Sequence, residues 1–281
     1  MLTVFGFGLR ARGADMLYLM KRPARLLVSL VAMFVIMPTM AVALALVFDL
    51  RPPVKIALVA LAISPVPPLL PRRETKAGGH AGHALALLAT AALLSVVVIP
   101  GALRILRIFV PQPLDLSFGT VALLALKTVL LPLLAGLVVH RLAPSLAARI
   151  EKPIALIATV VLSAGALVIL GTTLPAVGAI IGHGTVLVFV LFAVVGIAVG
   201  HSLGGPADED RVVLALSTAA RHPALALAIG TANYPGQKLV PAAILLYLLV
   251  SVIVSFLYIG WTRKHSTTTG QGLEPVPRQS G

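Results

Sequence analysis

The chain has 281 residues, of which 59% are hydrophobic and only 11% are charged, whereas a soluble domain carries roughly 25% charged residues. This composition excludes a water-soluble domain and predicts an all-α membrane protein that crosses the bilayer many times. The net charge of +13 does not indicate nucleic-acid binding, because the basic residues lie in short loops without interleaved aromatic residues. The chain has no cysteine, which excludes disulfides, thiol nucleophiles and thiolate metal sites.

Eight apolar stretches are long enough to span a bilayer. In chain order they cover residues 26–48, 53–71, 83–103, 116–139, 153–174, 184–203, 212–231 and 239–261. A ninth stretch, residues 1–9, would rise only about 14 Å as a helix, against a hydrocarbon core of about 30 Å. We therefore expect either that it is not a span or that its beginning lies before Met1.

Basic residues concentrate in alternate loops, as at Arg22, Arg72 and Arg149, whereas the intervening loops hold few, such as Arg51 and Arg104. The positive-inside rule places the first set and the C-terminus in the cytoplasm. This alternation requires residues 1–9 to cross, so we expect nine helices in one transmembrane domain over residues 1–262 of a cell (inner) membrane protein, with a first helix missing before Met1. Residues 263–281 are polar and rich in Gly and Pro, and are expected to form a disordered cytoplasmic tail.

Two further basic residues, Lys127 and Arg221, lie near the middle of predicted spans. A cation buried there costs at least about 2.5–3.5 kcal/mol on insertion scales, so it is rarely without a function. We expect all nine acidic residues to lie in loops or at span ends, which leaves no carboxylate inside the membrane to pair with either cation. We interpret both cations as facing a cavity that binds an anion; the alternative is that they bond helix-end carbonyls or extend to the membrane surface.

Arg221 belongs to a predicted helix interruption. Ser217, Thr218, Arg221 and His222 directly precede Pro223, which has no backbone donor and clashes with the carbonyl four residues earlier. Backbone groups freed inside a membrane are tolerated only where they line a cavity or are buried in protein. The alternative is an ordinary proline kink.

A second interruption follows Ser64, where Pro65, Pro67, Pro68 and Pro71 cannot all occupy one regular helix. With residues 1–9 counted, the two interrupted spans are the third and the eighth, so they are offset by five. Two units of five spans are necessarily inverted, because five is odd. Pro-interrupted segments at matching positions of two halves indicate the midplane site of a transporter.

Other polar groups predict less. His80 and His83 have helical spacing but no acidic or cysteine partner in sequence, so no metal site is expected. The acidic run 208–210 is expected to cap the following helix and complement its N-terminus. No buried Asp or Glu is expected to orient a catalytic base, so an enzyme is not expected.

Four motifs occur in a familiar order: FGFGL (5–9), KRPARLL (21–27), the Pro-rich interruption after Ser64, and LALSTAARHPALALAIG (214–230). Together they resemble the sodium/bile acid symporter family over about residues 1–262. The resemblance implies ten helices in two inverted five-helix repeats, with two broken helices that cross near the substrate site. The nine expected helices would correspond to helices two to ten of that plan.

The resemblance also implies where sodium would bind, and the sequence departs from the family there. The second broken helix of well-studied members carries a Glu followed by Gln-Asn, which help to bind sodium. The matching positions here are Ser217, Arg221 and His222. The first broken helix usually carries Gly-Gly and a Ser-Asn pair, which are replaced by Pro67-Pro68 and Leu70-Pro71. Thr90 matches a hydroxyl ligand in the next helix, but two sodium sites are not expected, and the charge of Arg221 would take over part of the role of sodium.

The sequence therefore predicts a secondary transporter that moves an organic or small inorganic anion by alternating access. Arg221 would hold the anion, and Lys127 would be a second anchor or a gating charge. Hydrogen bonds would come from Ser64, Thr90, Ser217, Thr218 and His222, of which His222 could also carry a proton. The expected partners are a small anion and membrane lipid, with no cofactor beyond a doubtful sodium ion. The alternative is a receptor or assembly subunit that uses the same scaffold without transporting.

Overall fold

The computed structural model describes residues 1–10, 18–106 and 118–270. In these ranges all regular secondary structure is helical. Six helical segments there are long and apolar enough to cross a membrane: Pro23–Val47, Ala81–Ile105, Gly119–Leu142, Thr185–Leu203, Asp208–Asn233 and Val240–Lys264. The all-α membrane class is therefore confirmed, and the finer expectation of nine visible helices stays a prediction.

The helices follow the predicted stretches closely. In chain order they are α1 (Leu2–Arg10), α3 (Pro23–Val31), α4 (Met37–Val47), α5 (Pro52–Ile63), α6 (Leu70–Lys76), α7 (Ala81–Leu106), α8 (Phe118–Ala125), α9 (Leu131–Leu142), α10 (Pro144–Gly178), α11 (Thr185–Leu203), α12 (Asp208–Ala219), α13 (Pro223–Asn233) and α14 (Val240–Gly270). Two short π-helical segments, η1 (Ala32–Ile36) and η2 (Leu126–Leu130), join α3 to α4 and α8 to α9. Because α14 continues to Gly270, the predicted tail begins inside a helix, and residues 271–281 lie outside the described part.

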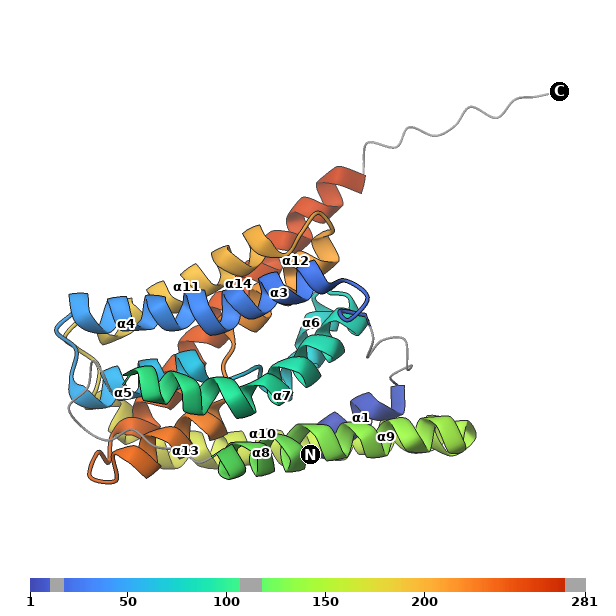
Figure 1. The fold of residues 1–281 in the computed structure, drawn as a ribbon, viewed down its shortest axis with the longest axis horizontal. Coiled ribbons are helices and arrows are strands. Elements are labelled where there is room, and N and C mark those ends of the chain that lie inside the picture. The colour runs from blue at the N-terminus through green and yellow to red at the C-terminus, as the bar shows by residue number, and fades with distance from the viewer. Residues whose placement is uncertain (11–17, 107–117, 271–281) are drawn as a thin grey trace.

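The helices form two groups (Figure 1). Along one side, α1 packs against α9 and α10. Helices α3, α4, α11 and α12 lie on the opposite side, and α5 and α7 lie between. In this view α13 lies at the level of α10, and α14 runs obliquely across the molecule toward α12. Contacts between α10 and α14 and between α7 and α8 connect them.

The contact between α1 and α9 depends on two glycines. A Cβ atom on Gly8 would overlap the backbone of α9 at Leu133 and Gly136, and one on Gly136 would overlap the backbone of α1 at Phe5 and Gly8. Small residues of this kind let helix backbones approach closely inside a membrane. The second glycine of the FGFGL motif is therefore explained by packing.

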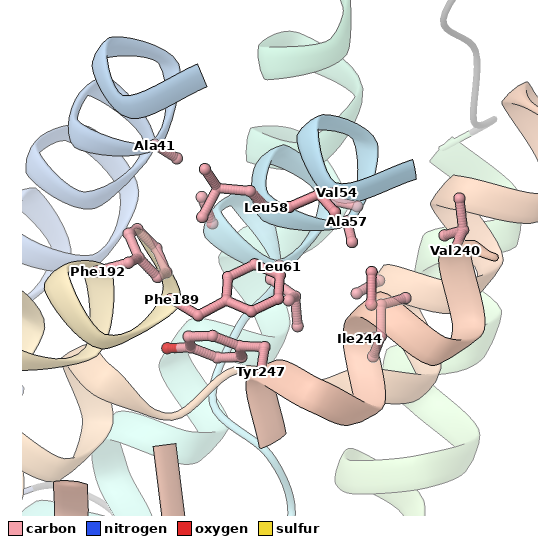
Figure 2. Packing of buried hydrophobic residues seen from close by; sticks show 14 of the residues in the cluster. Ala41, Val54, Ala57, Leu58, Leu61, Phe189, Phe192, Val240, Ile244 and Tyr247 are labelled. Atoms are coloured by element: carbon pink, nitrogen blue, oxygen red, sulfur yellow. The ribbon is translucent and has the colours of Figure 1, made fainter. Parts of the chain in front are cut away.

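Two hydrophobic cores lie on either side of the helix interruptions. The first joins α4, α5, α11, α13 and α14, and Figure 2 shows Leu58 and Leu61 of α5 beside Phe189, Phe192 and Tyr247. The second joins α6, α7 and α12 with parts of α1, α3, η2 and α9. The chain changes from one core to the other within 64–69 and again at 220–222, so both interruptions lie where the two cores meet.

Candidate functional site

Both proline-containing segments leave the helical conformation where the sequence predicts interruptions. Helix α5 ends at Ile63 and is followed by Ser64, whose backbone is extended, and α6 begins at Leu70. Helix α12 ends at Ala219 and is followed by Ala220, which is also extended, and α13 begins with Pro223 at its first position. Proline suits the first turn of a helix, because the N–H group that it lacks has no partner there.

The two interruptions are tied to each other. The backbone N–H of His222 donates to the carbonyl of Pro65 over 3.0 Å. The His222 ring accepts the N–H of Leu225 at 3.4 Å and so caps α13. On the other side, the Tyr247 hydroxyl donates to the carbonyl of Ala219, which is one of the last carbonyls of α12. The groups freed by the interruptions are thus partly satisfied by partners in other elements.

Arg221 lies where the interruptions meet and is completely buried, with 0% of its side chain exposed. Its Nη1 donates to the carbonyls of Ser64 and Met33, each at 3.3 Å. The guanidinium carbon is 5.9 Å from the centre of the Phe192 ring. Arg221 therefore joins the α12–α13 interruption to the α5–α6 interruption and to η1.

The Met33 carbonyl is available to Arg221 because of local helix geometry. In η1 the N–H of Met37 donates to Ala32, five residues back. In this register the donor for the Met33 carbonyl would be the nitrogen of Pro38, which carries no hydrogen. The carbonyl thus has no partner within its own helix, and the guanidinium fills that place.

Two nitrogens of the guanidinium remain without a partner. Nε and Nη2 of Arg221 are buried and make no hydrogen bond to any described residue. They lie on the same edge of the planar group, which is the edge that binds a carboxylate or similar oxyanion through two parallel bonds. The carbonyl bonds thus occupy one edge of Arg221 and leave the other edge available.

The hydroxyl groups predicted to bind substrate have other partners in this conformation. Ser64 Oγ donates to the carbonyl of Ala60 at 2.7 Å, and Thr90 Oγ1 donates to the carbonyl of Ala86 at 2.7 Å. Thr218 Oγ1 lies 2.5 Å from the carbonyl of Gly196, so it holds α12 against α11. The structure brings Ser64 to Arg221 through its carbonyl rather than through its hydroxyl.

Lys127 is not part of this cluster. It lies in η2, and its side chain is exposed on the outside of the bundle. The hydropathy pattern predicts how far along a span a lysine lies. It does not predict which face of the helix the lysine occupies. Lys127 as a second anchor therefore stays a prediction without support from its position.

Glu74 lies in the last turn of a short helix, at a helix end as expected, but it is buried, which the sequence does not predict. The interrupted helix continues beyond the predicted end at residue 71, because Leu70–Lys76 forms the half-helix α6. Glu74 is on its inner face, 0% exposed, and its Oε1 accepts a hydrogen bond from Ser217 at 2.6 Å. Sequence reasoning missed it because Arg72, Arg73 and Lys76 give this segment the composition of a cytoplasmic loop.

Asp210 is a second acidic residue with an unexpected environment. It lies in the first turn of α12, as predicted, but it is 1% exposed and does not cap the helix. Its carboxylate pairs with Arg25 and with His83 Nδ1, the latter at 2.8 Å, and accepts from the Tyr18 hydroxyl. The HAGH motif is thus explained by an ion-pair cluster between α3, α7 and α12, and no group of three or more His, Asp or Glu suited to a metal occurs in the described residues.

Two open cavities flank α6. One of about 680 Å³ lies between α6, α10 and α14, and its charged lining residues are Arg72, Arg73, Lys76 and Arg263. The other, of about 420 Å³, lies between α1, α6 and α7 and is lined by Arg10, Arg72 and Lys76. Neither lining includes a carboxylate from the described residues, so the charged side chains that line both cavities are all basic. Arg221 lines neither.

Comparison with known protein families gives a match for this chain. A model of the Sodium Bile acid symporter family matches residues 1–179, which is more than half of the sequence. The chain belongs to this family. As a member of the sodium bile acid symporter family with apolar helices of membrane-spanning length, it is a multi-pass membrane protein. The matched range includes the α5–α6 interruption and ends before Arg221.

A curated relative gives a second comparison. The chain is 29% identical over 140 residues to the "Uncharacterized sodium-dependent transporter YocS" of Bacillus subtilis (strain 168). The similarity covers 49% of this chain and 42% of the relative. The chain therefore matches less than half the length of this relative.

Proposed function

We propose that this member of the sodium bile acid symporter family is a secondary transporter that moves an organic or small inorganic anion across the cell membrane by alternating access. The observation that carries the proposal is Arg221, a fully buried guanidinium at the meeting point of two interrupted helices, with Nε and Nη2 unpartnered. A buried cation without a carboxylate partner is costly and favours an anionic ligand. The family and the transporter relative agree with this assignment.

The packing of the half-helices supports an inverted repeat. Helix α5, before the first interruption, packs against α13, after the second, and α6 packs against α12. The two interrupted helices therefore run in opposite directions through the bundle and cross at 64–69 and 220–222. Such opposed half-helices are typical of transporters with inverted repeats and a site near the midplane. A ten-helix plan, of which this chain would contain nine helices, fits this arrangement.

Access to Arg221 would require a movement between the helix groups. The guanidinium is closed off, whereas the two basic cavities open beside α6 between α1, α10 and α14. With the basic residues of α6 and the C-terminus in the cytoplasm, these cavities would face the cytoplasm and attract anions to that side. Movement of α1, α9 and α10 relative to the crossed helices would then connect the cavities to the Arg221 edge.

Uptake by proteoliposomes tests the proposal. A panel of anions from taurocholate to acetate and sulfate would first be ranked by how much each one stabilises the purified protein against heat. The protein would then be reconstituted into vesicles, and uptake of these anions from the outside would be measured. We expect saturable uptake of at least one anion that Arg221→Gln abolishes. Arg51→Gln is the matched control, because Arg51 also donates to a helix-end carbonyl, that of Ala179, outside the crossing. Absence of uptake for every stabilising anion would refute transport.

One observation favours the alternative of a non-transporting receptor or assembly subunit. Arg221 already bonds Ser64 and Met33, and this would hold the crossing in one conformation. Stabilisation by an anion without uptake, in protein that is fully folded, would support the receptor.

A further inference from the structure

Glu74 has an environment that the anion site does not explain. Its carboxyl group is 0% exposed on the inner face of α6, and only Oε1 has a partner, the Ser217 hydroxyl. Oε2 is buried and without a hydrogen bond to any described residue. A carboxylate in an apolar bundle needs a counter-ion or complete hydrogen bonding to remain charged.

No described cation pairs with Glu74, although charged and titratable groups lie on every element packed around it. On α12 this group is Asp210, in the interruption after α12 it is Arg221, on α7 His83, on α14 Arg263, and on α6 itself Arg72, Arg73 and Lys76. The side chain of Lys76 is exposed, and the others have other contacts: Asp210 pairs with Arg25 and His83, Arg221 with carbonyls, and Arg263 with the carbonyl of Lys76. Arg73 lies over the Phe256 ring, and Arg72 donates to Thr159. The Glu74 carboxyl therefore lacks an ion-pair partner in the described chain.

We propose that Glu74, which lies between α6 and α12, binds a proton, and that binding and release of this proton are coupled to anion transport. The neutral acid removes the uncompensated charge, and the hydrogen resides on Oε2, the oxygen that Ser217 leaves unused. Binding forms one O–H bond on the carboxylate and release breaks it, so no other reactant is required. The coupling rests on the proposed transport, whereas the proton site itself does not.

The position of α6 gives the proton a short route to water. Glu74 is buried, but Arg73 on one side of it in sequence lines the larger cavity and Thr75 on the other side lines the smaller one. A small rotation or displacement of α6 from α12 would break the Ser217 bond and turn the carboxyl group toward either cavity. The site is thus closed when α6 and α12 pack together and open when they separate.

A second titratable pair faces the same side of α12. Asp210, Val213 and Ser217 recur at helical spacing, with His83 bonded to Asp210 and Glu74 bonded to Ser217. The two contacts are about 10 Å apart along the helix axis, from the rise of 1.5 Å per residue. His83 Nε2, like Glu74 Oε2, is buried without a partner. His83→Gln is therefore tested beside Glu74→Gln, so that each group is assigned separately.

Labelling with dicyclohexylcarbodiimide tests the proton site directly, because this apolar reagent modifies buried carboxyl groups in their protonated form. In purified protein we expect mass spectrometry to find the adduct on Glu74 and its loss as the pH is raised. The adduct should be absent in Glu74→Gln and retained in His83→Gln and in Glu151→Gln, which changes a partly exposed acid paired with Arg10. An infrared carbonyl band of a neutral carboxylic acid should disappear in Glu74→Gln as well.

The outcomes separate the possible ligands and the two proposals. If neither the adduct nor the infrared band depends on Glu74, the proton site is refuted. If sodium at constant pH protects Glu74 from labelling, the ligand is a metal cation and the proton is refuted. In proteoliposomes, a proton gradient should accelerate anion uptake by the wild type, and Glu74→Gln should lose this acceleration. If anion uptake by the wild type does not depend on the proton gradient, the coupling is refuted. If there is no uptake at all, the proposed function is refuted, and the labelling result alone then tests whether Glu74 binds a proton.

Discussion

Replacement of Arg221 by Gln separates a ligand-binding arginine from a structural one. Nε and Nη2 are unpartnered and lie on one edge, so an oxyanion there would accept two charge-assisted hydrogen bonds. Each such bond is worth about 1.5–3 kcal/mol, so two at the lower value give about 3 kcal/mol. At about 1.4 kcal/mol per decade, Arg221→Gln should weaken anion binding by about 100-fold. Arg221→Lys keeps the charge but not the planar edge, and should recover only part of this loss.

The same substitution has a structural cost that must be measured beside the affinity. Nη1 donates to the carbonyls of Ser64 and Met33, and a buried carbonyl left without a donor costs about 1–3 kcal/mol. Thermal unfolding and anion affinity should therefore be determined on the same detergent-purified samples of Arg221→Gln, Arg221→Lys and the control Arg51→Gln. We expect Arg51→Gln to bind anions as the wild type does.

The result that would refute this reasoning is a folded Arg221→Gln protein with unchanged anion affinity. A loss of stability with normal binding in the surviving folded fraction would assign Arg221 to the carbonyls alone. It would then be a structural tie between the two interruptions.

Three further predictions concern the ion, the packing and the second ion-pair cluster. Anion uptake should persist when sodium is replaced by choline, because the matching ligand positions hold Ser217 and Arg221; a steep, cooperative dependence on sodium would contradict this. Gly136→Ala should destabilise the protein by about 1–3 kcal/mol through overlap of the added Cβ with α1. Gly101→Ala, whose added Cβ has no atom within 4 Å, should have little effect in the same thermal assay. Asp210→Asn should lower the free energy of unfolding by about 3–5 kcal/mol, since it breaks a buried pair and leaves other charges without a partner. The control Asp208→Asn changes an exposed residue and should alter that free energy by no more than about 0.5 kcal/mol. Equal stabilities of the two variants in chemical denaturation would rule out a structural role for the cluster.

The sequence predicts the helices well because membrane spans are defined by long apolar runs, and it predicts the interruptions because proline has few compatible helix positions. It does not predict which side of a helix a polar residue occupies. Lys127 and Arg221 look equivalent in hydropathy, yet one is exposed and the other is completely buried. That difference arises from tertiary packing, which no local pattern records.

Glu74 shows a second limit of the sequence. Leu70, Pro71 and Glu74 form the buried face of α6, at the spacing expected of one helix face. The basic residues between them dominate the composition of the segment and suggest a loop. A search for helical periodicity beyond the proline cluster, rather than for apolar content, would have placed Glu74 inside the bundle.

The π-helical segment η1 also determines how the preceding helix is rotated. One additional residue in a turn rotates the chain by about 100° around the helix axis. Helix α4 is fixed by its packing on α5 and α11, so the additional residue decides which side of α3 faces α12. Arg25 and Met33 lie eight positions apart on one stripe, and they meet Asp210 and Arg221, respectively. The π turn therefore sets the direction of both residues together, so that one stripe of the helix provides an ion pair near its start and a carbonyl for the guanidinium further along.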